Sequence, residues 1–189
     1  MLLAKQVYHL LGNEDLWQTA EYCDSVLRLE KLPYSICGGV AVCLHGYQRN
    51  TTEIDLVIRA EDRDAVSNSL IGAGFRWEEQ TVEFRSENGI AVQCLISSGE
   101  PAGKEAEVKI PEPIGDANVE IREGLCVVRL SRLIEMKLAS GQGNLRRTHK
   151  DFADVVELIV CRNLDGSFAS LLHKSLRKTF RELVRNANS

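Results

Sequence analysis

The sequence predicts an α+β fold in which a mixed β-sheet with flanking helices is followed by a helical C-terminal part. Helical and strand-like patterns are interspersed along the first 128 residues, an Asn88-Gly89 pair marks a β-hairpin, and the pattern is helical from Ser131 onward. We therefore expect an α/β core over residues 1–128 and a helical region over residues 129–189 that packs on this core.

The first part of the chain is expected to contain three helices and one strand. Asn13 is a favourable N-cap for a helix, and Pro33 stops the helix that follows it. Alternating β-branched and polar residues after Thr52 are typical of a strand. In chain order, the patterns predict a helix over 13–31, a short helix over 38–44, a strand over 53–59 and a helix over 61–73.

The second part should contain two hairpins and three helices. Turn residues join a strand over 81–85 to a strand over 90–96, and a second turn at Glu123-Gly124 joins strands over 117–122 and 125–128. Helical spacing of apolar residues then predicts helices over 131–140, 148–161 and 168–185.

The last predicted helix has one basic face. This face is either an ordinary solvated surface or a contact for an RNA backbone or an acidic partner. Its basic residues are Lys174, Arg177, Lys178, Arg181 and Arg185.

Composition indicates a cytoplasmic protein without a membrane segment. The chain has a net charge of −4, and its apolar runs are far shorter than a membrane span. The N-terminal segment lacks the order of a secretory signal peptide. Six cysteines without CxxC spacing point to reduced, mostly buried thiols rather than to disulfides or a zinc site.

Residues 37–58, CGGVAVCLHGYQRNTTEIDLVI, contain the candidate functional site. Glu53 and Asp55 lie two residues apart on a strand, so both carboxylates project from one face. Such a pair suits Mg²⁺, which binds one or two carboxylates together with substrate phosphates. Gly38-Gly39 at a helix start lets backbone N–H groups approach a phosphate. An ordinary turn followed by a strand edge explains the same spacing equally well.

The whole stretch resembles the signature GG-x-A-x-x-x-H-G-x-x-R-x-T-x-D-I-D-L of the nucleotidyltransferase superfamily of DNA polymerase β type. It is similar to the small bacterial branch, which includes minimal nucleotidyltransferases and AbiEii-like toxin components. The resemblance implies a nucleotidyltransferase-like mixed sheet over residues 1–128. It also implies that Glu53 and Asp55 bind Mg²⁺, and that an NTP substrate is held by Gly38, Gly39, Arg49 and Thr51.

A second element of the same branch, K…(R/K)D-x-x-D, resembles Lys137 followed by Lys150-Asp151 and Asp154. Lys137 is thereby a candidate catalytic residue that offsets phosphate charge. Its position at the edge of an apolar helix stripe is equally compatible with an ion pair to Asp151 or Asp154. Arg49 likewise suits either a phosphate or a salt bridge. His45, before a helix-ending glycine, is expected to be a packed or capping residue.

Two positions depart from the pattern. The first metal carboxylate is normally Asp and is Glu53 here, and the third carboxylate of relatives is replaced by Gln93. Glutamine cannot act as a base, and lost base assistance costs roughly 10²–10⁴-fold in rate. Glu83 on the preceding strand is a candidate substitute.

The sequence thus supports two functional hypotheses. The first is a Mg²⁺-dependent nucleotidyltransferase that transfers NMP from an NTP to a hydroxyl of RNA or protein, with a toxin role and an antitoxin partner as an extension from the family. The second is a degenerate member that binds nucleotide or a partner without catalysis. A purely structural interaction domain is a weaker third reading.

Overall fold

The computed structural model describes residues 2–97, 107–143 and 145–187, and it contains a mixed seven-stranded sheet over these residues. The strands are β1 (Tyr34–Cys37), β2 (Glu53–Ile58), β3 (Arg76–Glu78), β4 (Glu83–Arg85), β5 (Ala91–Ile96), β6 (Val119–Arg122) and β7 (Leu125–Val128). Their order across the sheet is β3-β4-β5-β2-β1-β7-β6. The predicted α+β class and both predicted hairpins are confirmed.

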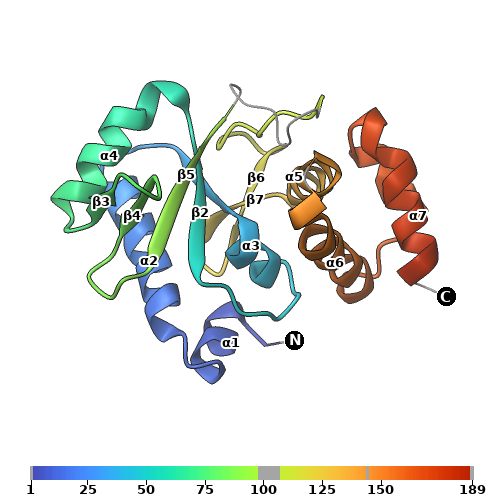
Figure 1. Cartoon of the computed structure of the whole chain (residues 1–189), viewed down its shortest axis with the longest axis horizontal. Coiled ribbons are helices and arrows are strands. Elements are labelled where there is room, and N and C mark those ends of the chain that lie inside the picture. The colour runs from blue at the N-terminus through green and yellow to red at the C-terminus, as the bar shows by residue number, and fades with distance from the viewer. Residues whose placement is uncertain (1, 98–106, 144, 188–189) are drawn as a thin grey trace.

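Helices surround the sheet and form the C-terminal part (Figure 1). The α-helices are α1 (Ala4–Leu10), α2 (Glu14–Leu29), α3 (Gly38–Leu44), α4 (Arg63–Gly72), α5 (Leu130–Gly143), α6 (Leu145–Cys161) and α7 (Arg177–Ala187). Short 3-10 turns cover Ala60–Asp62, Gly166–Leu171 and Lys174–Leu176. Within the described ranges, no helix is both long enough and apolar enough to cross a membrane.

Strand β2 is the central strand of the sheet, and its first four residues alternate between partly exposed and fully buried side chains. Ile54 and Leu56 have no exposed surface, while Glu53 and Asp55, which alternate with them, are partly exposed. Burial of each large apolar side chain contributes roughly 1.5–3 kcal/mol. This alternation fixes the strand register, since a slip of one residue would bury both carboxylates.

The neighbours of β2 set which residues meet the carboxylates. Strand β1 pairs with β2 in antiparallel orientation and β5 pairs in parallel orientation. In this register Cys37, Asp55 and Gln93 are direct partners across three strands. Gln93, at the position where relatives carry the third carboxylate, therefore lies beside Asp55 on the neighbouring strand.

Three elements were not expected from the sequence. Strand β1 has four residues that are all buried, so its sequence lacks the alternation that marks a half-exposed strand. Strand β3 is only three residues long, and all three are exposed. Helix α1, seven residues long, lies before the predicted cap Asn13. The side chain of Asn13 does not cap α2 but donates hydrogen bonds to Asn50 and Thr51.

The predicted single helix over 168–185 is wrong in its first half. An α-helix begins only at Arg177, after two 3-10 turns separated by extended backbone at Leu172. The buried carboxylate of Glu135 on α5 accepts a hydrogen bond from the backbone N–H of His173, at 2.5 Å. This contact, together with the side chain of Arg177 donating to the carbonyl of Leu172, holds the segment in a non-helical path.

Candidate functional site

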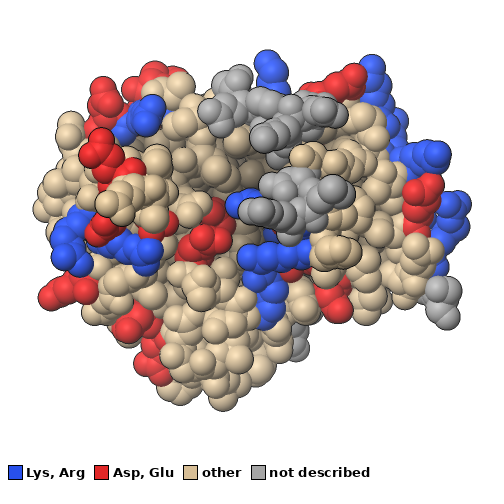
Figure 2. All heavy atoms as spheres, viewed as in Figure 1, with Lys and Arg blue, Asp and Glu red and all other residues tan. Residues whose placement is uncertain are grey.

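The predicted site residues line one cavity between β2 and the helices α5 and α6. Its volume is about 290 Å³, and Figure 2 shows a hollow at the centre of this face, with acidic and basic residues on opposite sides. The lining includes Gly38, Gly39, Arg49, Thr51, Glu53, Asp55 and Lys137, which are all seven residues that the sequence predicted. The two carboxylates form one wall, and the basic residues of α5 and α6 face them.

The two glycines leave room for side chains of the protein itself. Gly38 has a φ of +61°, and a Cβ atom built there would lie 1.8 Å from Oδ2 of Asp55. A Cβ on Gly39 would lie 2.6 Å from Oγ1 of Thr51 and 3.2 Å from a guanidinium nitrogen of Arg49. The sequence suggested that these glycines clear space for a phosphate. In the structure they first permit Asp55, Thr51 and Arg49 to approach the backbone.

The Asp55 carboxyl is held in an unfavourable environment when ionised. Burial, and then the nearby charge of Glu53, raise its pKa to about 6, while Lys137, Arg147 and Lys150 act in the opposite direction. A cation placed between Glu53 and Asp55 would remove this repulsion. The site is therefore predisposed to bind positive charge.

A buried ion network connects the site to α6. Lys137 lies 2.9 Å from Asp151 and 2.7 Å from Asp154, and Arg49 lies 2.7 Å from Asp154. Of the two readings of Lys137, the ion pair to Asp151 and Asp154 is therefore present, although the side chain also lines the cavity. Arg49 is likewise paired, with a largely buried side chain rather than a surface one.

Arg147 and Lys150 were not assigned a role from the sequence, although Lys150 belongs to the quoted motif. Both are exposed residues of α6 that line the cavity. Neither forms an ion pair within the described part of the chain, in contrast to Lys137 and Arg49. They supply positive charge that is not already balanced. The contribution of Arg147 and Lys150 to the cavity is visible only in the fold, because the fold places the first turns of α6 opposite β2.

Gln93 lies between two acidic side chains. Its Nε2 donates to Glu53 at 3.4 Å and to Glu83 at 3.3 Å. Glu83 is buried and also forms an ion pair with Arg85. The suggested proximity of Glu83 to the site is thus present, with Gln93 between Glu83 and Glu53.

His45 and Cys37 have structural roles. Burial lowers the pKa of His45 to about 4, and its neutral ring makes a 2.8 Å hydrogen bond with the carbonyl of Val128. This confirms the expected packed histidine, which ties α3 to β7. Cys37 is fully buried, and burial raises the pKa of its thiol well above its usual range, so the thiol stays protonated.

The donor atoms in the cavity suit a hard divalent cation. Glu53 and Asp55 provide carboxylate oxygens and Gln93 provides an amide oxygen, which are ligands that Mg²⁺ accepts. Across the described ranges, no group of three or more His, Cys, Asp or Glu side chains is arranged to hold a metal. The residues therefore fit one Mg²⁺ that completes its coordination with substrate phosphates and water, but not an all-protein metal cage.

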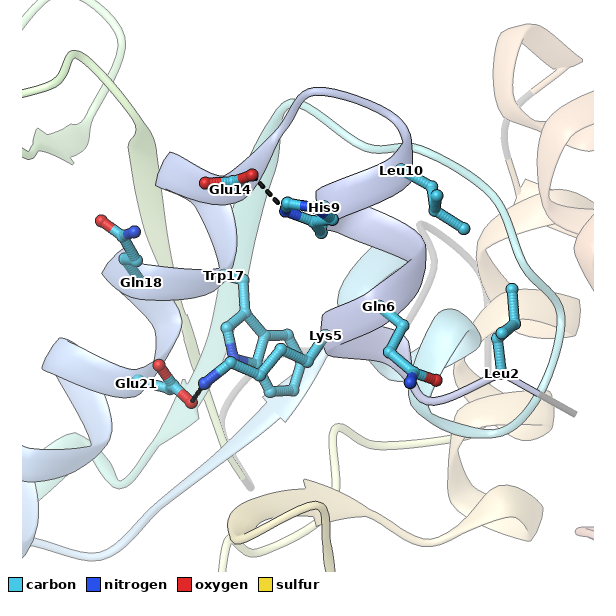
Figure 3. A pocket seen from close by; sticks show the side chains of 9 residues that line it. All are labelled: Leu2, Lys5, Gln6, His9, Leu10, Glu14, Trp17, Gln18 and Glu21. Carbon is cyan, nitrogen blue, oxygen red and sulfur yellow. Dashed lines mark hydrogen bonds and ion pairs between the residues drawn. The ribbon is translucent and has the colours of Figure 1, made fainter.

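A second hollow, of about 640 Å³, lies between α1 and α2 and has different chemistry. Figure 3 shows the ring of Trp17 at this hollow, where Lys5 pairs with Glu21 and His9 pairs with Glu14. Its side chains are therefore already engaged with one another, in contrast to the exposed Arg147 and Lys150 of the first cavity. None of the predicted site residues lines it.

Comparison with known proteins identifies the fold. No family model matches the chain, and no curated protein matches it in sequence. Its structure is similar to that of ANT(2'')-Ia in complex with adenylyl-2''-tobramycin, with a TM-score of 0.54, 16% identity and coverage of 88% of this chain and 95% of that one. The chain has the nucleotidyltransferase fold.

Two further nucleotidyltransferase-fold structures agree. An antigenic nucleotidyltransferase-like protein from Paracoccidioides brasiliensis has a TM-score of 0.56 and 18% identity, with 91% of each chain covered. A candidate nucleotidyltransferase from H. pylori has a TM-score of 0.50 and 16% identity, with 90% of this chain and 93% of that chain covered. The nucleotidyltransferase fold implied by the motif is confirmed, whereas the branch with AbiEii-like toxin components stays a prediction.

The strained environment of Asp55 gives a pH-dependent stability. A pKa of about 6 in the folded protein exceeds the ordinary value of 3.8, so the folded state binds this proton more tightly than the unfolded state. Protonation of Asp55 therefore stabilises the folded state at low pH, and this contribution to the free energy of unfolding is lost as the pH rises through 6. At pH 8, Asp55→Asn should therefore increase the free energy of unfolding by about 1–3 kcal/mol, and this gain should shrink at pH 5.

Thermal unfolding at pH 8 and pH 5 measures this effect. Asp116→Asn, at an exposed position in a turn, is the matched control and should change the melting temperature little at either pH. A lower melting temperature of Asp55→Asn at pH 8 would show that ionised Asp55 stabilises the fold, contrary to this expectation.

Proposed function

We propose that the protein is a Mg²⁺-dependent nucleotidyltransferase that transfers NMP from an NTP to a hydroxyl group. The observation that supports this most strongly is the distribution of charge in the cavity. Glu53 and Asp55 line one side, and Arg147 and Lys150 line the opposite side. A nucleoside triphosphate with Mg²⁺ has the complementary distribution, since its metal suits the carboxylates and its phosphates suit the basic residues.

Each site residue has a role in this proposal. Glu53 and Asp55 hold Mg²⁺, which when bound neutralises phosphate charge and orients the reacting groups. Gly38, Gly39 and Thr51 line the part of the cavity that contacts the triphosphate. Arg147 and Lys150 contact its phosphates directly. Lys137 and Arg49 remain paired with Asp151 and Asp154, and this neutral network holds α6 beside the cavity.

The reaction is an in-line displacement at the α-phosphorus. The acceptor hydroxyl oxygen forms a bond to phosphorus while the bond to the α,β-bridging oxygen breaks, and pyrophosphate leaves with the bonding electrons. The hydroxyl proton passes to water, because Gln93 cannot accept it. Without base assistance, the rate is expected to be roughly 10²–10⁴-fold below that of a relative with a carboxylate at this position.

A second candidate function is nucleotide or partner binding without turnover, and Gln93 is the observation that favours it. Binding requires the carboxylates of Glu53 and Asp55 and the basic side chains of Arg147 and Lys150, all of which line the cavity. Turnover also requires proton removal, for which the position of Gln93 offers no base. The two candidates therefore share the binding step and differ only in pyrophosphate release.

An RNA hydroxyl is the acceptor class that the surface favours. Lys178, Arg181 and Arg185 on α7, with Lys174 just before it, are exposed, and none is ion-paired within the described ranges. Figure 2 shows basic residues gathered along the edge formed by α7. Such a strip suits a phosphate backbone. A protein acceptor and a toxin role with an antitoxin partner are further extensions that rest on the motif resemblance.

Nucleotide binding should depend on Mg²⁺ and on Asp55. We expect wild-type protein to bind ATP with Mg²⁺ in calorimetry and to bind it at least 10-fold more weakly in EDTA. Asp55→Asn should lose the metal-dependent part, because the substitution removes a charge while keeping the shape of the side chain. The control Asp116→Asn should bind as the wild type does.

The outcomes separate the two functions. Pyrophosphate release with ATP and RNA identifies an enzyme, whereas binding without release identifies the non-catalytic alternative. If wild-type protein gives no heat at millimolar ATP and Mg²⁺, both functions are wrong.

RNA binding should depend on α7. The double reversal Lys178→Glu with Arg181→Glu should weaken binding of a single-stranded RNA and flatten the dependence of affinity on salt, because fewer counterions are released. Arg177 is excluded because its side chain donates to the carbonyls of Leu172 and Ser170. A matched double reversal at Lys31 and Arg76, both exposed, controls for net charge. Equal affinity and salt slope in all proteins would return this face to an ordinary solvated surface.

A further inference from the structure

Glu83 is a buried acid that the proposed reaction does not use directly. Its side chain lies on β4, one strand beyond Gln93, and the residue is only 4% exposed. One of its oxygens accepts from Nε2 of Gln93 at 3.3 Å, and Arg85 forms an ion pair with it from the same strand. Burial of a carboxylate requires such partners, so this acid is held firmly in place.

The contacts of Gln93 fix the direction of its amide. A primary amide has two N–H donors and one carbonyl acceptor. Both donors are engaged, one with Glu53 and one with Glu83. The carbonyl oxygen Oε1 is therefore the atom that Gln93 presents to the cavity it lines.

The identities at positions 83 and 93 depend on each other. A carboxylate at position 93 would lie within hydrogen-bond distance of the carboxylates of both Glu53 and Glu83, with no donor between them. An amide at 93 instead bridges these two acids. Conversely, without the acid at 83, the amide at 93 loses one of the two acceptors that orient it.

We propose that the third acidic group of the site has moved by one strand, from β5 to β4, so that Glu83 acts as a positioning residue through Gln93. The acid at 83 holds the Gln93 amide, and the amide in turn holds Glu53 for the cation. This role rests on the proposed function, because it concerns the same Mg²⁺–nucleotide site. The neutral oxygen of Gln93 would then be available to the cation, while the negative charge of Glu83 is held on the nitrogen side of the amide.

A swap of the two groups tests the proposal without changing composition. The four proteins are the wild type, Glu83→Gln, Gln93→Glu and the double variant with both substitutions. Glu78→Gln is the control, because Glu78 pairs with Glu83 in the sheet but is exposed. Thermal unfolding without nucleotide reports the coupling of the pair, and calorimetry with ATP and Mg²⁺ reports its effect on binding.

We expect Gln93→Glu to lower the melting temperature in the wild-type background, because three carboxylates then lie in contact, and to lower it much less in the Glu83→Gln background. Glu83→Gln alone should weaken Mg²⁺-dependent ATP binding about 10-fold, as loss of a group that orients a metal ligand does. The double variant should recover most of this affinity. Glu78→Gln should match the wild type in both measurements.

Two results would overturn the proposal in distinguishable ways. If Gln93→Glu shifts the melting temperature equally in both backgrounds, or Glu83→Gln binds ATP as the wild type does, the role of Glu83 is wrong while the proposed function stands. If the wild type itself binds no ATP with Mg²⁺, the proposed function fails, and the role of Glu83 fails with it.

Discussion

The repulsion between Glu53 and Asp55 on the central strand is the interaction on which the rest of the site depends. Both carboxylates project from one face of β2 because Ile54 and Leu56 occupy the other. Burial and this neighbouring charge raise the pKa of Asp55 to about 6. The surrounding residues reduce the unfavourable free energy of ionised Asp55. Gly38 leaves space for its side chain, and basic residues of α5 and α6 face it.

Charge balance explains why the basic residues divide into two sets. Arg49 and Lys137 are matched by Asp151 and Asp154, which gives a buried and internally neutral network that joins α5, α6 and the segment before β2. A network of this kind needs every member, because removal of one partner leaves a buried unpaired charge. Arg147 and Lys150 lie outside it and, within the described part of the chain, form no ion pair that would compete with an anion. The network thus holds the helices in place, while Arg147 and Lys150 supply the positive charge for the proposed phosphate contacts.

Much of this arrangement could be predicted from the sequence. The motif around Gly38 and Asp55 led to the correct fold, and the Asn-Gly turn led to the correct pairing of β4 with β5. The partner of Arg49 could not be predicted, because Asp154 lies 105 residues further along the chain. The contact of Glu83 depends on the exact hairpin register, which turn residues alone do not specify. Strand β1 was missed because a fully buried strand shows no alternation, and the last helix was placed too early because Glu135 holds the backbone at His173.

Localisation of a divalent cation tests the central claim most directly. Mn²⁺ accepts the same carboxylate, carbonyl and water ligands as Mg²⁺ and gives anomalous scattering. In crystals grown with Mn²⁺ and a non-hydrolysable ATP analogue, the account predicts an anomalous peak within coordination distance of both Glu53 and Asp55, with the phosphates directed toward Arg147 and Lys150. A peak elsewhere, or nucleotide bound with its phosphates away from α6, would contradict it.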